Sequence, residues 1–573
     1  MSPDVNLDSF SESIEVLEAV VGALEYIAEN DTIQRVIVSQ DQLTTLLDFV
    51  DHRPTFAPPA SDDTTSVTDA YADIRKRISR IVTLVTMNDS NMVDIPKHVD
   101  IMTRFKQWMT LGLHTGKELE EDEIRMSGAL CIGNLARSDE ACRALVMDHG
   151  VADALLALLT MEMERVKAGS ALMAAGTSAV NEIKSCVKVI HAVVGAFKNL
   201  SIAVADRKVL GQLGIIKPIA GLLDIEVVQP VHFPCIGVLK NLCAGGNELN
   251  AFRIITGLEP PANETKVAKL DISSVTPQSK TPLTKLIKHI WKATGDNLTN
   301  VRNEGGRVIV NLVRTSHLAG APQLINVVVQ SSGITPLIQI VTGALLTRVN
   351  EDQKPTDGSQ NELHHHVHFD AVPSDGQVFP VVQNEGLVAL ILMANAVPTS
   401  IPIITKYHAS LIAISKKILL SGLPDVEKEK EAAVEVARDS KTGLQPPPSE
   451  EVLYSDEVKV NCCLFLGVLA SADATFAQIA LPEINPVLDK LTKWTSVSNL
   501  TAASAVSEKS ALAYKEAANR GSATSILSRT GTKSVKRLVH SNVEGGPSTA
   551  ESVEEGLRLA EAVKRLKGVL ERK

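Results

Sequence analysis

The chain has 573 residues, a formal net charge of −10 and only 3% aromatic residues. This length exceeds that of a single hydrophobic core, and the low aromatic content argues against a β fold. The N-terminus is acidic and polar and no apolar run reaches about 20 residues, so we expect neither a secretory signal nor a transmembrane segment.

Charge is unevenly distributed along the chain. From Leu500 onward there are 13 Lys or Arg against 8 Asp or Glu, a net of +5, which leaves −15 on the remainder. An acidic body disfavours nucleic acid as a partner and predicts an inner surface that attracts a cationic protein. The alternative is that acidity only keeps a large protein soluble.

The N-terminal region predicts divergent helical repeats. Residues 10–50 place apolar residues at i, i+3, i+4 and i+7, and a Pro/Ser/Thr-rich loop is expected over 52–68. A further helix is expected over 70–89. Residues 117–125 (KELEEDEIR) look like a charged insert.

The stretch over 124–159 predicts one armadillo-type unit. Apolar residues recur at helical spacing up to Ala136, Ser138-Asp139 breaks the helix, and Gly150 marks a turn before a third apolar run. Its Asn134-Leu pair recurs after 65, 42 and 70 residues, at Asn199, Asn241 and Asn311. The middle interval is one repeat, and about ten such repeats fit between residues 10 and 495.

The whole pattern predicts an all-α, armadillo-repeat right-handed α-solenoid with irregular loop insertions. The expected segments are N-terminal repeats over 1–115, central repeats over 116–350, a polar His-containing insertion over 351–380, C-terminal repeats over 381–497 with an insertion over 422–452, and a partly disordered, low-complexity tail over 498–573 that ends in an amphipathic helix over 551–571.

No motif indicates catalysis or a bound cofactor. The His cluster over 364–368 lies in a polar insertion without a second ligand site, so a solvated loop explains it better than a metal site. Gly112-Leu-His-Thr-Gly116-Lys117 is one residue too short for a phosphate loop and follows no strand. The seven Cys form no CxxC pair and favour a reducing, cytosolic compartment, with the nucleus as an alternative.

We call Asn134, Asn199, Asn241 and Asn311 the ladder asparagines. Stacked repeats would place them on one inner surface, where each amide can bond a partner's main chain through its C=O and its NH₂. Alternatively, each bonds backbone within its own repeat and stabilises a turn. Lys198 and Lys240, directly before two of them, are either solvated flanks or partner contacts.

Five segments, in order, resemble the smg GDP-dissociation stimulator family: SGALCIGNLARSDEACRALV, AFKNLSIAVADRKVL, EGGRVIVNLVRTS, VVQSSGITPLI and QNEGLVALILMA. The resemblance covers roughly residues 120–470. It implies a cytosolic, monomeric armadillo protein that binds Ras- and Rho-type GTPases with polybasic, prenylated tails, stimulates GDP release and chaperones them. It implies no enzyme chemistry and no cofactor.

The resemblance also suggests which residues contact the GTPase. Asn134, Arg137 and Asp139 match one family motif, Lys198-Asn199 the next repeat, and Gln383-Asn384-Glu385 a third. Arg307 matches a family arginine. The full expected set is Asn134, Arg137, Asp139, Lys198, Asn199, Asn241, Arg307, Asn311, Gln383, Asn384 and Glu385.

Two other readings of the repeats differ in their partner. An importin-like carrier of basic peptides needs a Trp four residues before each ladder asparagine, but Leu130, Gly195, Gly237 and Arg307 stand there. A scaffold that binds acidic or mixed peptides would need a basic surface, against which the acidic body argues.

Overall fold

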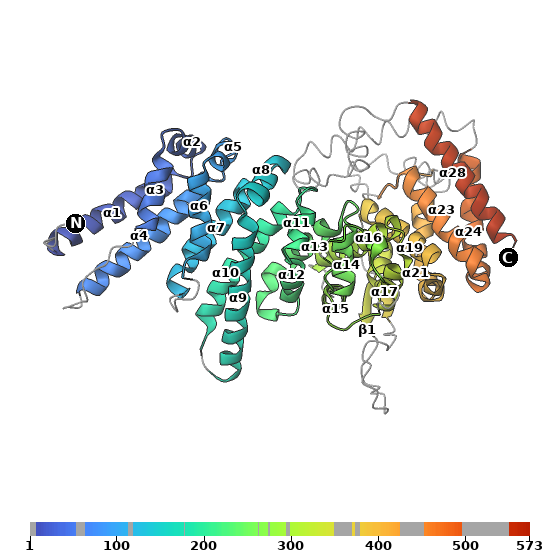
Figure 1. Ribbon diagram of the computed structural model, residues 1–573. Coiled ribbons are helices and arrows are strands. Elements are labelled where there is room, and N and C mark those ends of the chain that lie inside the picture. Colours follow the sequence, from blue (N-terminus) through green and yellow to red (C-terminus); the bar gives the residue numbers. More distant parts are fainter. Residues whose placement is uncertain are drawn as a thin grey trace, which may run out of the picture. The chain divides into compact units, whose positions relative to one another are not determined.

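The computed structural model describes most of the chain as helices (Figure 1). The described residues are 7–52, 63–112, 118–176, 178–261, 263–272, 276–293, 298–348, 369–372, 379–423, 452–495 and 549–572. They fall into two compact units, residues 1–242 and 243–573. The boundary lies inside the predicted central segment, 116–350.

Unit 1 consists of helices only, within the part of it that the structure describes. They are α1 (Leu7–Ile27), α2 (Asp31–Ser39), α3 (Gln42–Asp51), α4 (Asp63–Val85), α5 (Asn91–Asp94), η1 (Ile95–Lys97), α6 (Val99–Thr110), α7 (Glu118–Leu135), α8 (Asp139–Arg143), η2 (Ala144–Asp148), α9 (Val151–Ala174), α10 (Val180–Leu200), α11 (Arg207–Gln212), α12 (Ile216–Leu222), η3 (Glu226–Val231) and α13 (His232–Cys243), the last of which ends at the first residue of unit 2.

Unit 2 continues the helical pattern and adds a two-stranded ribbon. Its elements are α14 (Glu248–Thr256), η4 (Val267–Lys269), α15 (Pro282–Lys292), α16 (Thr299–Leu318), α17 (Pro322–Gln330), α18 (Ile334–Thr342), β1 (Leu345–Arg348), β2 (Phe369–Val372), α19 (Pro380–Ala396), η6 (Pro398–Ser400), α20 (Ile401–Thr405), α21 (His408–Leu420), α23 (Asp456–Ala472), α24 (Ala474–Trp494) and α28 (Thr549–Leu570). The antiparallel strands pair Leu345 with Val372 and Arg348 with Phe369.

Helices pack in chain order within each unit, which confirms the expected all-α solenoid class. In unit 1, α4 packs on α7 and α7 on α10; in unit 2, α16 packs on α19 and α19 on α23. Among the described residues, α4, α7, α10, α13, α16, α19 and α23 each follow a shorter helix, apart from α10, which follows the longer α9. The expected number of about ten repeats stays a prediction.

Local sequence signals set the repeat of the 124–159 stretch as expected. Ser138 caps α8, because its Oγ accepts a hydrogen bond from the backbone N–H of Ala141 at 3.1 Å. Gly150 has φ +60°, a left-handed conformation that favours glycine, and α9 starts directly after it.

Two expectations for the N-terminal half need correction. Helix α4 begins at Asp63, inside the loop expected over 52–68, and α7 begins at Glu118. The segment 117–125 is therefore mostly the first turns of a helix and not an insert. Two of its charged residues, Asp122 and Arg125, are buried.

The insertions are described only in part. Residues 349–368 and 424–451, with the His cluster and most of the 422–452 insertion, lie outside the described residues, as do 496–548 of the expected disordered tail. The two strands β1 and β2 flank the His-containing segment and were not foreseen. Between α14 and α15, the described residues contain the short η4 as their one helical element.

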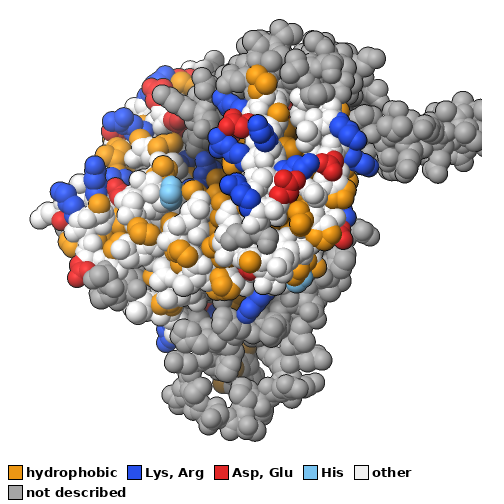
Figure 2. All heavy atoms as spheres, turned by 90° about the vertical axis from the view of Figure 1, so that its right-hand side faces the viewer, with side chains coloured by type: hydrophobic (Ala, Val, Ile, Leu, Met, Phe, Trp, Pro, Cys, Tyr) orange, Lys and Arg blue, Asp and Glu red, His pale blue; other side chains and the backbone are white. Residues whose placement is uncertain are grey.

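Helix α28 lies where the sequence predicts a terminal amphipathic helix, and it packs on α23 and α24 (Figure 1). Leu559, Val563 and Leu566 on one side of it are buried. Figure 2, which faces this end of unit 2, shows Lys and Arg side chains interspersed with carboxylates and apolar side chains. Lys567 Nζ lies 2.6 Å from Asp489 Oδ1 of α24, so an ion pair supports the apolar contact.

Candidate protein-binding face

The ladder asparagines of unit 1 link neighbouring repeats. Asn134 Nδ2, on α7, donates to Thr83 O at 3.2 Å and to Thr86 Oγ1 at 3.1 Å, at the end of α4. Asn199 Nδ2, on α10, donates to Gly133 O of α7 at 2.9 Å. Asn241 Nδ2, on α13, donates to Lys198 O of α10 at 3.3 Å. Each amide therefore reaches back to the preceding repeat.

Small residues permit this close stacking. A Cβ placed on Gly133 would lie only 3.5 Å from Ala196 Cα of α10, so the two backbones nearly touch. Gly128 is similarly close to Phe105, Trp108 and Met109 of α6. At these two glycines α7 is therefore close-packed against α6 and α10.

The ladder asparagines of unit 1 act inside the unit as donors. Asn134 and Asn241 each donate two hydrogen bonds and Asn199 donates one. All three are half-buried, and their side-chain oxygens accept no hydrogen bond within the described part of the chain. A partner therefore meets acceptors that these donated bonds hold in place.

Unit 2 repeats this arrangement with different partners. Asn461 Nδ2, on α23, donates to Asn384 Oδ1 of α19 at 2.8 Å, so here one asparagine bonds another. Asn311 is half-buried on α16.

Arg307 and Glu385, both expected to contact a partner, bind each other instead. Arg307 Nε lies 2.8 Å and Nη2 3.2 Å from the two Glu385 carboxylate oxygens, a bidentate pair, and Nη1 lies 3.1 Å from Glu304 Oε1. Burial acts to lower the pKa of Arg307, but the charges of Glu385 and Glu304 outweigh it and the pKa is raised. This triad joins α16 to α19.

Gln383 faces the core rather than a partner. Its side chain is fully buried, Nε2 donates to Val341 O at 2.6 Å, and Oε1 accepts from the Tyr454 hydroxyl at 2.7 Å. Both of these bonds are internal, so Gln383 positions α19 against α18.

The remaining expected residues lie at the edge of the ladder in unit 1. Arg137 is 3.6 Å from the exposed Asp89, and Asp139 is exposed at the start of α8. The Lys198 stem covers Gly237, and its Nζ lies 5.5 Å from the centre of the Phe233 ring. Lys198 therefore packs along α13 as well as flanking Asn199.

We define the ladder face of unit 1 as the exposed and half-buried side of α4, α7, α10 and α13 with the residues that directly follow them. It was expected to be acidic, but among the residues whose exposure the structure describes, basic side chains outnumber acidic ones eight to four. The basic residues are Lys76, Arg77, Arg80, Arg137, Lys184, Lys188, Lys198 and Lys240, and the acidic ones are Asp69, Asp73, Glu123 and Glu182.

The ladder face of unit 2, the corresponding side of α16, α19 and α23, has the opposite sign. It carries four acidic residues, Glu304, Glu385, Asp456 and Glu457, and two basic residues, Arg307 and Arg314. Since Arg307 occupies Glu304 and Glu385, the acidity available to a partner comes mainly from the start of α23.

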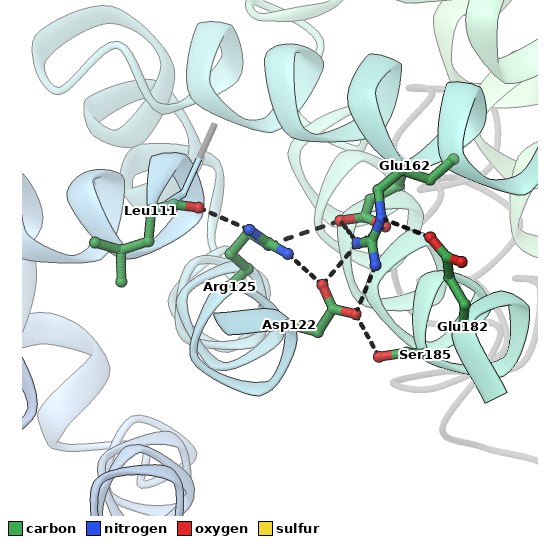
Figure 3. Close-up of polar contacts among 7 residues, drawn as sticks. Leu111, Asp122, Arg125, Glu162, Glu182 and Ser185 are labelled. Carbon is green, nitrogen blue, oxygen red and sulfur yellow. Dashed lines mark hydrogen bonds and ion pairs between the residues drawn. The ribbon is translucent and has the colours of Figure 1, made fainter. Parts of the chain in front are cut away.

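A buried ionic cluster behind the ladder face was not foreseen (Figure 3). Arg165 Nη1, on α9, lies 2.7 Å from Asp122 Oδ1 of α7 and 2.9 Å from Glu162 Oε2. Arg125 pairs with Asp122, and its Nη1 donates to Leu111 O at 2.7 Å. Asp122 also accepts from the Ser185 hydroxyl of α10 at 2.5 Å.

The cluster joins three helices and carries near-balanced charge. Burial raises the pKa of the Glu162 carboxyl, Asp122 adds to this, and Arg165 opposes it. Because Arg125 and Glu162 are fully buried and paired within the cluster, we assign the cluster to structure. The signal was present in the sequence as Asp122/Arg125 and Glu162/Arg165, each spaced i, i+3 on a helix with an apolar face.

Metal and membrane features are equally sparse. No group of three or more His, Cys, Asp or Glu side chains within the described ranges could hold a metal ion. Over the same ranges, no single helix has the length and apolarity to cross a membrane, although three bent helix pairs meet those criteria jointly. The end of the Gly112–Lys117 segment lies outside the described residues.

Comparison with known proteins identifies relatives of one kind. No protein-family model matches the chain. It is 24% identical over 339 residues, 59% of its length, to Rap1 GTPase-GDP dissociation stimulator 1-A of Xenopus laevis. It is 25% identical over 315 residues to stimulator 1-B of that species, and 23% over 288 residues to GTPase-GDP dissociation stimulator vimar of Drosophila melanogaster. The resemblance to this family is confirmed.

The chain spans less than half the length of these relatives, 45%, 44% and 38% respectively. Among solved structures, it resembles two engineered proteins at 15% identity. One has a TM-score of 0.49 and covers 98% of this chain and 97% of its own, and the other has 0.35 with 62% and 97%. Scores below 0.5 do not define a shared fold.

Proposed function

We propose that the chain binds small GTPases of the Ras and Rho type and accelerates their release of GDP. The observation that carries this proposal is the match to three relatives, each named as a GTPase-GDP dissociation stimulator. A helical stack with surface-presented acceptors and ion pairs is compatible with binding a folded protein.

Such stimulation requires binding energy and no catalytic side chain. If the chain binds the nucleotide-free GTPase more tightly than the GDP-bound form, it lowers the affinity for GDP by the same factor. A hundredfold difference corresponds to about 2.7 kcal/mol of coupling, well within what a protein interface supplies.

We place the basic, prenylated tail of the client on the ladder face of unit 2. The exposed Glu457 and the half-buried Asp456 begin α23 there, and the Asn384–Asn461 pair lies further along the same side. The basic ladder face of unit 1 would repel such a tail. Opposite charge at α23 would speed encounter in a salt-dependent way, and holding the tail would let the chain act as a chaperone for it.

A second candidate function is an adaptor that binds extended peptides without exchange activity. The basic ladder face of unit 1 favours it, because this is the surface that an acidic-peptide scaffold needs.

The deciding experiment measures release of fluorescent GDP from a panel of Rho and Ras GTPases, each with and without its basic tail. Acceleration that depends on the tail and weakens with salt is expected. Glu457→Lys should weaken it, whereas Glu561→Lys on α28, an equal charge change elsewhere, should not. If the chain neither accelerates GDP release from any GTPase of the panel nor forms a complex with one, the proposal fails and the adaptor function is favoured.

A further inference from the structure

The hairpin that α9 and α10 form extends past α7 and α12 on one side of unit 1 (Figure 1). Helix α9 has 24 residues and α10 has 21, whereas α6 and α12, which contact α9, have 12 and 7. At a rise of about 1.5 Å per residue, α9 is about 36 Å long and α12 about 10 Å. These neighbours do not cover the far end of the hairpin, and residues 171–176 are all exposed.

The two helices of this hairpin stay close-packed almost to its end. A Cβ placed on Gly169 would lie 2.9 Å from Ile183 Cγ1 and 3.8 Å from Ala179 Cβ, so α10 lies directly against α9 there. Gly176 has φ +85°, a left-handed conformation that favours glycine, where the chain turns back. The end of the hairpin is therefore presented by two packed helices and has a defined position within unit 1.

We define the hairpin tip as residues 168–181, which contain no charged side chain. Its large apolar residues Leu172, Met173 and Val180 have exposed fractions of 46%, 44% and 40%. Single exposed apolar side chains are common on protein surfaces, but several that gather at one projecting end mark an interaction site. The tip thus offers an apolar contact that unit 1 itself does not use.

Exposed lysines stand behind this tip on both helices. Lys167 of α9 precedes Leu172 by five residues, and Lys184 of α10 follows Val180 by four. These spacings correspond to about 7.5 Å and about 6 Å along the helix axes. Because the two helices run antiparallel, both lysines lie at a similar distance from the end of the hairpin.

The charge behind the tip is basic on balance. Lys167, Lys184 and Lys188 are exposed, and none of them forms an ion pair with a carboxylate of the described residues. Of the two carboxylates nearest in the chain, Glu182 has its Oε1 3.7 Å from the Nε of a buried arginine on α9, and Glu164 is exposed. In a chain of net charge −10, the three lysines form a local field of opposite sign to the average.

An anionic lipid surface matches both features of the tip. Apolar side chains of peripheral proteins enter a bilayer by about 5–10 Å, to the boundary between headgroups and acyl chains. The lysines lie behind the tip by a similar distance, so their ammonium groups reach the phosphates while their stems cross the interface. A protein partner would need a pocket for the tip and carboxylates on both sides of that pocket, whereas a lipid surface supplies an apolar layer beneath an anionic one.

We propose that the hairpin tip is a contact site for membranes that contain anionic lipids. Leu172, Met173 and Val180 enter the interface, and Lys167 and Lys184 bind phosphates of the headgroups. The contact is peripheral and reversible, because a few side chains supply far less binding energy than a spanning helix. It goes beyond the proposed GDP-release function and uses no residue of the ladder face of unit 2.

The test measures co-sedimentation of the full chain with vesicles of phosphatidylcholine alone or of phosphatidylcholine mixed with phosphatidylserine. Binding to the mixed vesicles only, weakening with salt, is expected. Lys167→Glu with Lys184→Glu should weaken it by about twentyfold or more, since each lysine contributes about fivefold near an anionic surface. Lys97→Glu with Lys208→Glu, the same charge change at two other exposed lysines of unit 1, should leave it within about twofold.

A second set of variants tests insertion of the apolar side chains. Leu172→Glu with Met173→Glu should abolish vesicle binding, whereas Val93→Glu with Val99→Glu, which changes two other exposed apolar residues of unit 1, should not.

A fluorescent label reports the depth of the tip directly. The seven native cysteines are buried, so an environment-sensitive dye reacts first with the thiol introduced by Met173→Cys. Its emission should shift to the blue with mixed vesicles, and the same dye on Val93→Cys should not respond.

The proposal is overturned if phosphatidylserine makes no difference, if tip and control variants bind alike, or if the dye at position 173 does not respond. It is also overturned if the chain binds no vesicle but self-associates in sedimentation velocity through Leu172 and Met173, which would assign the tip to a second copy. These results stand apart from the GDP-release assay, because no GTPase is present.

Discussion

Asparagine side chains hold successive repeats together at the residue scale. Asn199 donates a hydrogen bond from its NH₂ to Gly133 O in the preceding repeat. Asn134 and Asn241 donate in the same way, one repeat earlier and one repeat later. The bond is structural, as the second alternative expected, but it runs between repeats and not within one. Contact of these amides with a partner stays a prediction.

Asn199→Ala should therefore destabilise the fold. Removing the amide leaves a carbonyl in a close-packed contact without its donor, which costs about 1–2 kcal/mol. Chemical denaturation of the variant should show a lower midpoint with an unchanged slope. Asn181→Ala, an exposed residue at the other end of α10, is the matched control. Equal midpoints for Asn199→Ala and wild type would contradict the structural role.

Asp206 predicts a pH-dependent stability. It is buried, and neither carboxylate oxygen has a hydrogen-bond partner among the described residues. Burial raises its pKa to about 6, with Arg143 opposing and Asp139 adding to the shift. Since the folded state then binds the proton more tightly than the unfolded state, this group destabilises the fold above pH 6, and the penalty fades as the pH falls towards about 3.8.

Asp206→Asn should accordingly raise the free energy of unfolding by about 1–3 kcal/mol at pH 7.5. The gain over wild type should shrink as the pH is lowered from about 6 towards 4. Asp148→Asn, an exposed residue of the same region, provides the comparison. A gain that is constant with pH, or a loss at pH 7.5, would show that the carboxylate is satisfied in solution.

At the scale of single elements, helix α28 packs one face on α23 and α24. Leu566→Ala should destabilise this contact by about 2–4 kcal/mol, since it removes a buried side chain. Leu557→Ala changes an exposed residue of the same helix and should stay within about 0.5 kcal/mol. Hydrogen exchange of the α28 amides reports the difference. Similar protection in both variants would indicate that α28 is not docked.

The elements also show why sequence reasoning succeeded for the ladder and failed for its charge. The Asn-Leu phase, the Ser138 cap and the Gly150 turn are local signals, and local signals set helices. The charge of a face depends on which residues of one helix share a side. Averaging over the acidic body therefore hid the basic residues of the unit 1 ladder face, among them Lys184 and Lys188 of α10.

Buried charged side chains were the second feature that the sequence did not reveal. Asp122 and Arg125 were assigned to a charged insert, and unpaired charged residues rarely enter a core. They are buried because α9 supplies Glu162 and Arg165 in opposite sign, and pairing across helices distant in sequence is not visible from one segment. The same holds for Arg307 and Glu385, 78 residues apart.

Two compact units define the scale of the whole molecule and predict unfolding in more than one step. The three Trp report on them separately: Trp108 lies in unit 1, and Trp291 and Trp494 lie in unit 2. A variant with Trp108→Phe and another with Trp291→Phe and Trp494→Phe should show different denaturation midpoints by fluorescence, because helical repeats couple mainly to their neighbours. Coincident midpoints would show that both units unfold as one cooperative block.

The asparagine links of unit 1 all point the same way, from a later repeat to an earlier one. A repeat emerging from the ribosome thus finds its acceptor already in place, and no link has to wait for sequence not yet made. Truncation from the C-terminal side removes each donor asparagine together with its helix. Truncation from the N-terminal side leaves the first remaining asparagine without the acceptor of the preceding repeat. The stack is accordingly built for assembly in the direction of its own synthesis.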